Sequence, residues 1–267
     1  MKVLRMNILQ KIADERKIDV ARAMKNTPLR ELEEEARSAP PVRNFAAALT
    51  GDAEEVRIIA EIKAASPSRG AIRPDLDAAW MAARYEEGGA VAVSVLTEPH
   101  HFKGGPEHLK AARASCGLPV LRKDFILSGY QVVESRVMGA DSLLLIVALL
   151  DEPLLSDLIS LCRWWGMEPL VEVHDREELD VAIRAGAAII GVNNRDLTTF
   201  RVDVETSMKL AVLMPPDVVA VSESGIKSRG QIRALQGAGY HAFLVGEHLC
   251  SAEDPAGTLR ELVGAGR

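Results

Sequence analysis

The segment REELDVAIRAGAAIIGVNNR, residues 176–195, contains the repeating unit that decides the fold. Its first part, REELDVAIRAGA, has the apolar spacing of an amphipathic helix and ends at a glycine, a residue that supplies left-handed helix C-caps. An apolar strand, AIIGVN, follows at residues 188–193, and polar residues stand where it ends. A helix, a buried strand and a polar strand end therefore succeed one another within this one segment.

The same unit recurs along the chain. Apolar segments predict strands at residues 56–63, 90–96, 119–124, 142–147, 169–173, 188–193, 218–224 and 242–246. Glycine also ends the helical patterns in EEGGA, RVMGA and GAGY. Strands that are apolar throughout and alternate with helices indicate a parallel sheet covered by helices. Eight such units favour a closed (β/α)8 TIM barrel over an open doubly wound sheet.

Residues 1–50, ahead of the first predicted strand, form an N-terminal helical extension. Leu4, Ile8 and Ile12 fall on one helical face, and Thr27 and Pro28 are typical of the N-cap and first turn of a second helix. A barrel does not need this extension, which would be a lid over one end or a helical plug. No low-complexity linker follows it, so we expect residues 1–267 to form a single domain.

Composition argues against several functional classes. A formal net charge of −6 gives no basic surface for nucleic acid. The cysteines Cys116, Cys162 and Cys250 are odd in number, far apart and in no CxxC pair, so we expect no disulfide framework and no metal site. The apolar run SLLLIVALL is shorter than the roughly 18 residues of a membrane span, and the N-terminus lacks a signal peptide's apolar core. We expect a cytoplasmic protein without a membrane partner.

Chemistry is expected where the strands end, because the loops after their C-terminal ends form the active face of such a barrel. Glu61 and Lys63 lie two residues apart, so they share one face of the first strand. With Lys123, Glu172 and Glu223 from other strand ends, they should converge on one rim, although a single charge there is usually a solvated loop residue. Proximity should shift their pKa values apart, as acid and base roles require. For Lys123 we expect neighbouring cations to lower the pKa toward neutrality.

The last two strand ends indicate a phosphate site. Gly225 in SESGIKS and Gly246 in LVGEH follow these strands directly, where backbone N–H groups and a short helix can hold a phosphate. Glycine has no Cβ to block a close approach. A single glycine after a strand is more often a turn, so the prediction depends on the pair. The sequence has no GxxxxGK or GxGxxG motif, so nucleotides and dinucleotides are not indicated.

Two histidine motifs have simpler explanations than catalysis. His100 and His101 have no third ligand at zinc-like spacing, so we interpret them as a loop pair. His174 and Asp175 follow the fifth strand, where we expect a helix cap rather than a catalytic dyad.

The chain resembles the indole-3-glycerol phosphate synthase family of tryptophan biosynthesis. Seven segments carry the resemblance in the family's order: AEIKAASPSRG, LRKDFI, LLLIV, GMEPLVEVHD, GVNNRDL, SESGI and FLVGEHL. The likeness covers nearly the whole chain, including the extension. It implies a barrel-shaped carboxy-lyase that acts without a cofactor. Its reaction would convert 1-(2-carboxyphenylamino)-1-deoxyribulose 5-phosphate to indole-3-glycerol phosphate, with release of carbon dioxide and water.

The resemblance also implies catalytic roles. Lys123 matches the general acid that protonates the ribulose carbonyl, and Glu172 matches the general base of the dehydration. Lys63 would hold the anthranilate carboxylate, with Glu61 positioning it. The residues that would orient the substrate and the catalytic carboxylate are Asn193 and Glu223.

Binding roles follow from the same resemblance. Ser66, Arg195 and Ser224 match further polar contacts. Gly225, Gly246 and the backbone of Glu247 would bind the phosphate. The side chains that would enclose the aromatic ring are Phe102, Phe125, Leu144 and Leu197. Ala64, Ala65 and His248 depart from the family pattern, which often has cations at the first two positions and serine at the third, and these changes would weaken substrate affinity.

We expect a small sugar-phosphate substrate, no cofactor and a monomer, with a weak homo-oligomer as the alternative. Two other functions stay open on the residues alone. One is an aldolase in which Lys63 or Lys123 forms a Schiff base. The other is a non-catalytic barrel that only binds a phosphate ligand.

Overall fold

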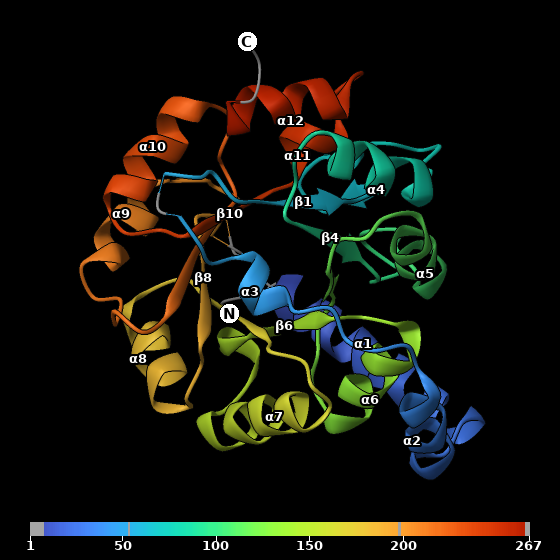
Figure 1. The fold of residues 1–267 in the computed structure, drawn as a ribbon. Coiled ribbons are helices and arrows are strands. Elements are labelled where there is room, and N and C mark those ends of the chain that lie inside the picture. Colours follow the sequence, from blue (N-terminus) through green and yellow to red (C-terminus); the bar gives the residue numbers. More distant parts are fainter. Residues whose placement is uncertain (1–7, 53, 197–198, 265–267) are drawn as a thin grey trace, which may run out of the picture.

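The protein is described by a computed structural model of residues 8–264, apart from residues 53, 197 and 198 (Figure 1). Within these residues, eight parallel strands close a barrel in the order β1-β10-β9-β8-β7-β6-β5-β4. The strands are β1 Ile58–Ile62, β4 Ala92–Leu96, β5 Val120–Lys123, β6 Ser142–Ile146, β7 Leu170–Val173, β8 Ile189–Asn193, β9 Val219–Glu223 and β10 Ala242–Val245. Each lies inside a predicted strand, so the predicted (β/α)8 barrel is confirmed.

Helices surround the barrel and connect its strands. They are α4 Ala78–Glu87, α5 Pro106–Ser115, α6 Gly129–Met138, α7 Glu152–Trp164, α8 Arg176–Arg184, α9 Glu205–Ala211, α10 Arg229–Gly237, α11 Glu247–Cys250 and α12 Pro255–Val263, with a 3-10 turn η1 at Val147–Leu149. The glycines at the four predicted helix ends have positive φ angles, as expected: Gly89, Gly139, Gly186 and Gly239. A small hairpin, β2 Ala65–Ser66 with β3 Gly70–Ala71, follows β1 and was not predicted.

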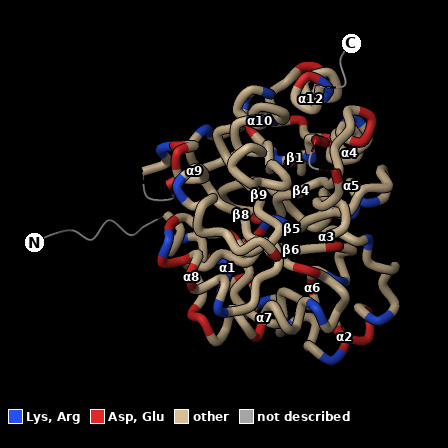
Figure 2. The backbone as a smooth tube through the Cα atoms, turned by 60° about the vertical axis from the view of Figure 1, so that its left-hand side comes forward, with Lys and Arg blue, Asp and Glu red and all other residues tan. Residues whose placement is uncertain are grey.

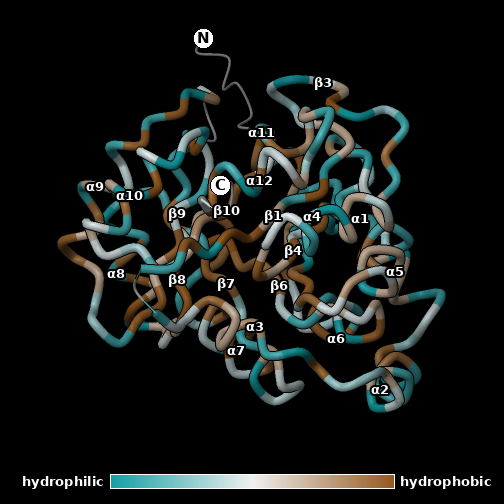
Figure 3. The backbone as a smooth tube through the Cα atoms, turned by 45° about the horizontal axis from the view of Figure 1, so that its top comes forward, coloured by the Kyte–Doolittle hydropathy of each residue, from teal (hydrophilic) through white to brown (hydrophobic). Residues whose placement is uncertain are grey.

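The strands separate two apolar cores. Along β1, Ile58, Ala60 and Ile62 pack against the helices, whereas Ile59 belongs to the core inside the barrel. Successive strand residues point to opposite faces, so each strand supplies both layers. The strands are correspondingly the brown, hydrophobic centre of the molecule (Figure 3), and acidic and basic residues are interspersed over the outer helices (Figure 2).

The N-terminal extension contacts the barrel at both ends. Helix α1, Ile8–Asn26, places Leu9 and Ile12 in the inner core together with Phe125. Helix α2, Leu29–Ser38, packs on the outside against α6 (Figure 1). Short helix α3, Phe45–Ala48, contributes Phe45 to the inner core from the opposite end. Both predicted alternatives, lid and plug, therefore describe a part of the extension.

The cap of α2 differs from the prediction. The helix begins at Leu29, Pro28 is its N-cap, and no side chain makes a cap hydrogen bond there. The Thr27 cap was therefore wrong by one residue, because the proline with its fixed φ precedes the helix instead of occupying its first turn.

Cys116, Cys162 and Cys250 are buried and unpaired. Among the helices described, none combines the length and the apolar character needed to cross a membrane.

Candidate active site

The predicted charged residues converge at the end of the barrel where the strands finish. Lys123 Nζ lies 2.6 Å from Glu223 Oε2 and 3.5 Å from Glu172 Oε2. Lys63, just after β1, pairs with Glu61 Oε1 at 2.5 Å. The three glutamates are at most 3% exposed. The barrel thus brings together five charges from β1, β5, β7 and β9, as the strand ends predicted.

The alternation of the strands explains this convergence. Inward-facing residues early in the strands fill the inner core, and they are Ile59, Leu121, Leu170 and Val221. Two residues later the same face holds the charges, which are Glu61, Lys123, Glu172 and Glu223 in the same order of strands. Because side chains two residues apart share a face, the charges point into the barrel mouth rather than toward the helices.

The two glutamates beside Lys123 have opposite pKa shifts. Burial raises the pKa of Glu223, and the charges of Glu172 and Glu61 add to this effect, so the pKa reaches about 7 despite Lys123. Burial also acts to raise the pKa of Glu172, but Lys123, His174 and Asn193 outweigh it and lower the pKa to about 2. Glu223 lies closer to Lys123 than Glu172 does, yet its pKa is the one that is raised. Distance from Lys123 therefore does not decide the direction of the pKa shift. The decisive difference is that Glu172 has two additional partners, whereas Glu223 Oε1 has no hydrogen bond within the described residues.

The expectation of a lowered pKa for Lys123 is wrong. Burial does act in that direction, but the charges of Glu223, Glu172 and Glu61 outweigh it and raise the pKa of Lys123 above its usual range. Lys63, a cation at the same strand ends, is itself paired with Glu61. Lys123 is therefore an ammonium group at neutral pH, able to donate a proton and unsuited to attack as a neutral amine.

A cavity of about 690 Å³ opens above these charges. Its apolar wall includes Phe102, Phe125 and Leu144, and the two phenylalanine rings lie 6.1 Å apart between centroids. The other predicted residues on its surface are Glu61, Lys63, Lys123, Glu172, Asn193, Arg195, Ser224, Gly225, Gly246 and Glu247. Ser66 lies in a smaller adjoining cavity of about 90 Å³. The predicted position Leu197 lies outside the described residues.

The rim formed by the last two strands depends on glycine for reasons beyond an approaching ligand. Gly225 has a φ of +81°, and a Cβ there would lie 2.5 Å from Val202 Cγ1. At Gly246 a Cβ would lie 2.1 Å from Glu61 Oε1. Gly246 therefore makes room for a buried carboxylate of the charge cluster, in addition to leaving the rim open. The side chain of Glu247 turns to Arg69 at 2.5 Å and to Arg195 at 3.7 Å.

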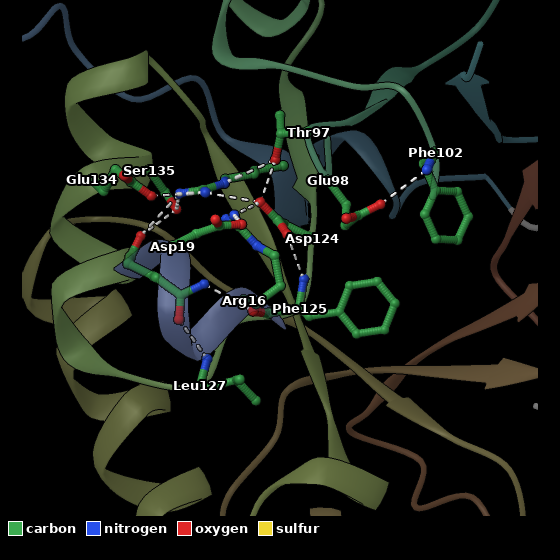
Figure 4. A network of polar contacts seen from close by, with 12 residues as sticks. Arg16, Asp19, Thr97, Glu98, Phe102, Asp124, Phe125, Leu127, Glu134 and Ser135 are labelled. Atoms are coloured by element: carbon green, nitrogen blue, oxygen red, sulfur yellow. Dashed lines mark hydrogen bonds and ion pairs between the residues drawn. The ribbon is translucent and has the colours of Figure 1, made fainter. Parts of the chain in front are cut away.

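A buried polar network holds α1 at the mouth of the barrel (Figure 4). Asp124, next to Lys123 in the chain, accepts hydrogen bonds from Arg16 of α1 at 3.0 Å, from Arg122 at 2.9 Å and from Thr97 at 2.7 Å. Asp124 and Arg122 are at most 1% exposed. The predictions assigned no role to Arg16 or Arg122, since neither stands out in the sequence from an ordinary surface arginine.

The loop after β4 connects the same helix to the cavity wall. Glu98, fully buried, accepts hydrogen bonds from the backbone N–H groups of His100 and His101. It accepts a third from the N–H of Phe102 (Figure 4). The two histidine rings contact carboxylates of α1, at 2.9 and 2.6 Å, which agrees with their interpretation as a loop pair. Within the described part of the chain, no group of three or more His, Cys, Asp or Glu side chains could hold a metal ion.

His174 is another residue beside the site whose role the sequence interpretation missed. Asp175 caps α8 as expected, because its side chain accepts a hydrogen bond from the Glu178 N–H. His174 instead turns inward, and its Nε2 lies 3.4 Å from Glu172 Oε1. The alternation of the strand could have predicted this, because His174 follows Glu172 by two residues and side chains at that spacing share a face.

Known proteins are similar to this chain in sequence and in fold. The model of the indole-3-glycerol phosphate synthase family matches residues 9–262. A synthase of that name from Syntrophobacter fumaroxidans is 49% identical over 97% of this chain and 98% of its own. Another, from Desulfosudis oleivorans, is 54% identical over 77% of this chain and 78% of its own.

A solved structure supports the fold alone. The N-acetylmannosamine-6-phosphate 2-epimerase from Clostridium perfringens aligns over 85% of this chain and 99% of its own, with a TM-score of 0.60 and 13% identity. The barrel, the charge cluster at its mouth and the match along nearly the whole sequence lead to one conclusion: this chain belongs to the indole-3-glycerol phosphate synthase family of carboxy-lyases.

Proposed function

We propose that the chain closes the pyrrole ring of 1-(2-carboxyphenylamino)-1-deoxyribulose 5-phosphate and releases carbon dioxide and water to form indole-3-glycerol phosphate. One observation carries this proposal. The Lys123 ammonium lies between two buried glutamates in a cavity that also has an aromatic wall and a glycine-containing rim. Family membership supports the same reaction.

Lys123 is the general acid in this proposal. As the aromatic ring carbon attacks the ribulose carbonyl, negative charge develops on the carbonyl oxygen, and the Lys123 ammonium donates its proton there. Glu223 and Glu172 hold the ammonium in place before the transfer. A positioned acid of this kind typically accelerates a reaction by roughly 100-fold or more.

Glu172 is the general base. Its low pKa keeps it ionised at neutral pH, so it can accept a proton as the hydroxyl group leaves as water. Glu223, with its pKa near 7, and Asn193, which bonds Glu172, orient this carboxylate and the substrate. Lys63 binds the carboxylate that departs as carbon dioxide, while Glu61 holds Lys63 in position.

Two anchors bring the reacting carbons together. The phosphate binds at Gly225, Gly246 and the backbone of Glu247, with Ser224 beside them. The aromatic ring lies against Phe102, Phe125 and Leu144, and Arg195 and Ser66 supply further polar contacts. Fixing both ends of a flexible substrate removes much of the entropic barrier to ring closure.

The Schiff-base alternative loses support at Lys123 in this geometry. An aldolase lysine must be a neutral amine to attack a carbonyl, whereas three carboxylates keep Lys123 protonated. Borohydride reduction in the presence of substrate tests it directly: a covalently tagged lysine would indicate the aldolase, and an unmodified one is expected.

The decisive experiment supplies purified protein with the carboxyphenylamino-deoxyribulose phosphate and follows indole fluorescence. Steady appearance of the indole signal is expected. Tight binding of indole-3-glycerol phosphate without turnover, even at high protein concentration, would instead identify a non-catalytic binder. We also propose a single-domain, monomeric, cytoplasmic protein that binds no nucleic acid, as the sequence predicts.

A further inference from the structure

His174 occupies an inward-facing position that continues the catalytic face of β7. Leu170 lies in the inner core, Glu172 in the charge cluster, and His174 follows at the same spacing. Its side chain is only 15% exposed. It is absent from the residues that line the substrate cavity, whereas Glu172, which it contacts, is among them. Glu172 is therefore the site residue through which we expect His174 to act on the reaction.

Helix α8 fixes the histidine from behind. Glu178 Oε2 accepts hydrogen bonds from both the backbone N–H of His174, at 2.8 Å, and its ring Nδ1, at 3.0 Å. The ring is thereby oriented so that Nε2 faces Glu172 Oε1 at 3.4 Å. Nε2 has no hydrogen bond within the described residues, so its buried N–H is available to tighten onto Glu172.

Charge supports the same geometry. Burial lowers the pKa of His174, but Glu172 and Glu178 outweigh it and raise the pKa to about 10. The charged groups beside His174 are Glu178 from α8 and Glu172 from β7. Beyond Glu172 lie Lys123, Glu223 and Glu61. An imidazolium ion thus lies between two carboxylates at neutral pH, with one Glu172 oxygen toward His174 and the other toward Lys123.

We propose that His174 is a positioning residue for Glu172: held by Glu178, it fixes Oε1 of the general base so that Oε2 faces Lys123 and the substrate. This inference rests on the proposed role of Glu172. Without His174, Glu172 would lose a charged partner and one of the contacts that restrict its rotation. Its ionised form would be less favoured, and the pH needed to ionise it would rise.

The test uses His174→Ala and His174→Gln in the full chain, with the carboxyphenylamino-deoxyribulose phosphate as substrate. We expect kcat to fall about 10-fold in the alanine variant, with KM changed less than about 3-fold, because the lost contact orients the base and not the substrate. In a plot of kcat against pH, the acidic limb should shift to higher pH by at least about one unit. The glutamine variant, which keeps a hydrogen-bond donor without the charge, should recover part of kcat while its acidic limb stays displaced.

Asp175→Ala is the matched control, because it removes the adjacent cap of α8 and retains the side chains of His174, Glu172 and Glu178. It should lower the melting temperature and leave the acidic limb unmoved. If the His174 variants lose stability as this control does but keep the parental pH profile, the positioning role is wrong. If His174→Ala fails to fold, the dependence of kcat on pH in His174→Gln tests the positioning role instead.

Glu172→Gln, measured in parallel, separates the two proposals. Near-parental turnover in Glu172→Gln would remove the general-base role itself. Loss of turnover in Glu172→Gln, combined with an unmoved acidic limb in both His174 variants, would overturn only the inference about His174.

Discussion

The inside of the barrel has two ends with opposite chemistry, although the same strands build both. Where the strands begin, Ile59 and Leu121 pack with Phe45 and Leu49 of the N-terminal extension, and all four are at most 2% exposed. Two residues further along the same strands, the inward-facing positions hold Glu61 and Lys123 instead. One end therefore stabilises the fold by apolar burial, and the other carries buried charges that the fold must accommodate.

This difference suggests that stability and catalysis can be altered separately. Substitutions at the apolar end should change the free energy of unfolding and leave turnover intact. Substitutions at the charged end should change turnover strongly, and some should even stabilise the fold, since buried charges are costly to desolvate.

The largest effect is expected from Phe45→Ala at the apolar end. Phe45 is 2% exposed in the inner core, so its removal should lower the free energy of unfolding by roughly 3–5 kcal/mol through lost burial and a cavity. Urea denaturation measures this loss, and Phe45→Leu should restore most of it. The kcat of the folded fraction should stay parental. A large fall in kcat would show that the two ends are not independent.

At the charged end, Lys123→Ala and Glu172→Gln should each lower turnover by at least ~100-fold, about 2.7 kcal/mol in activation free energy. The reason is that the acid and the base of the proposed reaction are lost. Single-turnover fluorescence measures the rate, and circular dichroism should show that the barrel is retained. A near-normal rate in either variant would refute the role assigned to that residue.

A smaller effect is expected from Gly246→Ala. The new Cβ would lie 2.1 Å from Glu61 Oε1, so the carboxylate must move and displace Lys63. A shift of this kind should lower kcat/KM by about 10-fold. Gly237→Ala is the control, since no atom lies within 4 Å of its added Cβ. Equal kinetics in the two variants would mean that the room beside Glu61 is not required.

A pH-dependent effect on stability is expected at Glu223. Its pKa is raised to about 7 in the folded state, above the ordinary glutamate value of 4.5 that an unfolded chain approaches. Between these values the folded state binds a proton that the unfolded state has lost, so this group makes stability fall as pH rises from about 4.5 to about 7. Glu223→Gln should remove that fall and gain stability relative to the parent above pH 7. Urea titrations at several pH values test this, and a constant difference across the range would contradict it.

The barrel and most of its site were predictable because both follow short periods in the sequence. Alternation along each strand placed Glu61, Lys123, Glu172 and Glu223 on the inner face, and the order of strands placed them at one end. The same period contained His174, but the neighbouring Asp175 offered a simpler explanation as a helix cap. Asp175 does cap the helix, but the cap does not explain the position of His174.

The direction of the Lys123 pKa shift was not predictable, because it depends on distances between atoms far apart in the chain. Lys123 and Glu223 are 100 residues apart and lie 2.6 Å from each other in the fold. The sequence shows that lysines and glutamates share a rim, but it does not show which lysine pairs with which glutamate. That pairing makes Lys123 an ammonium group surrounded by carboxylates.

The sequence by itself determined the eight strands, the left-handed glycines that end the helices and the charged residues at the strand ends, because local periodicity and local backbone conformation encode them. Only the tertiary structure decided that α1 lies at the mouth while α3 fills the opposite end. It also decided that Lys123 lies between Glu172 and Glu223 and that His174 faces Glu172. These features depend on through-space contacts, and electrostatic energies follow the distances between charges rather than their separation along the chain.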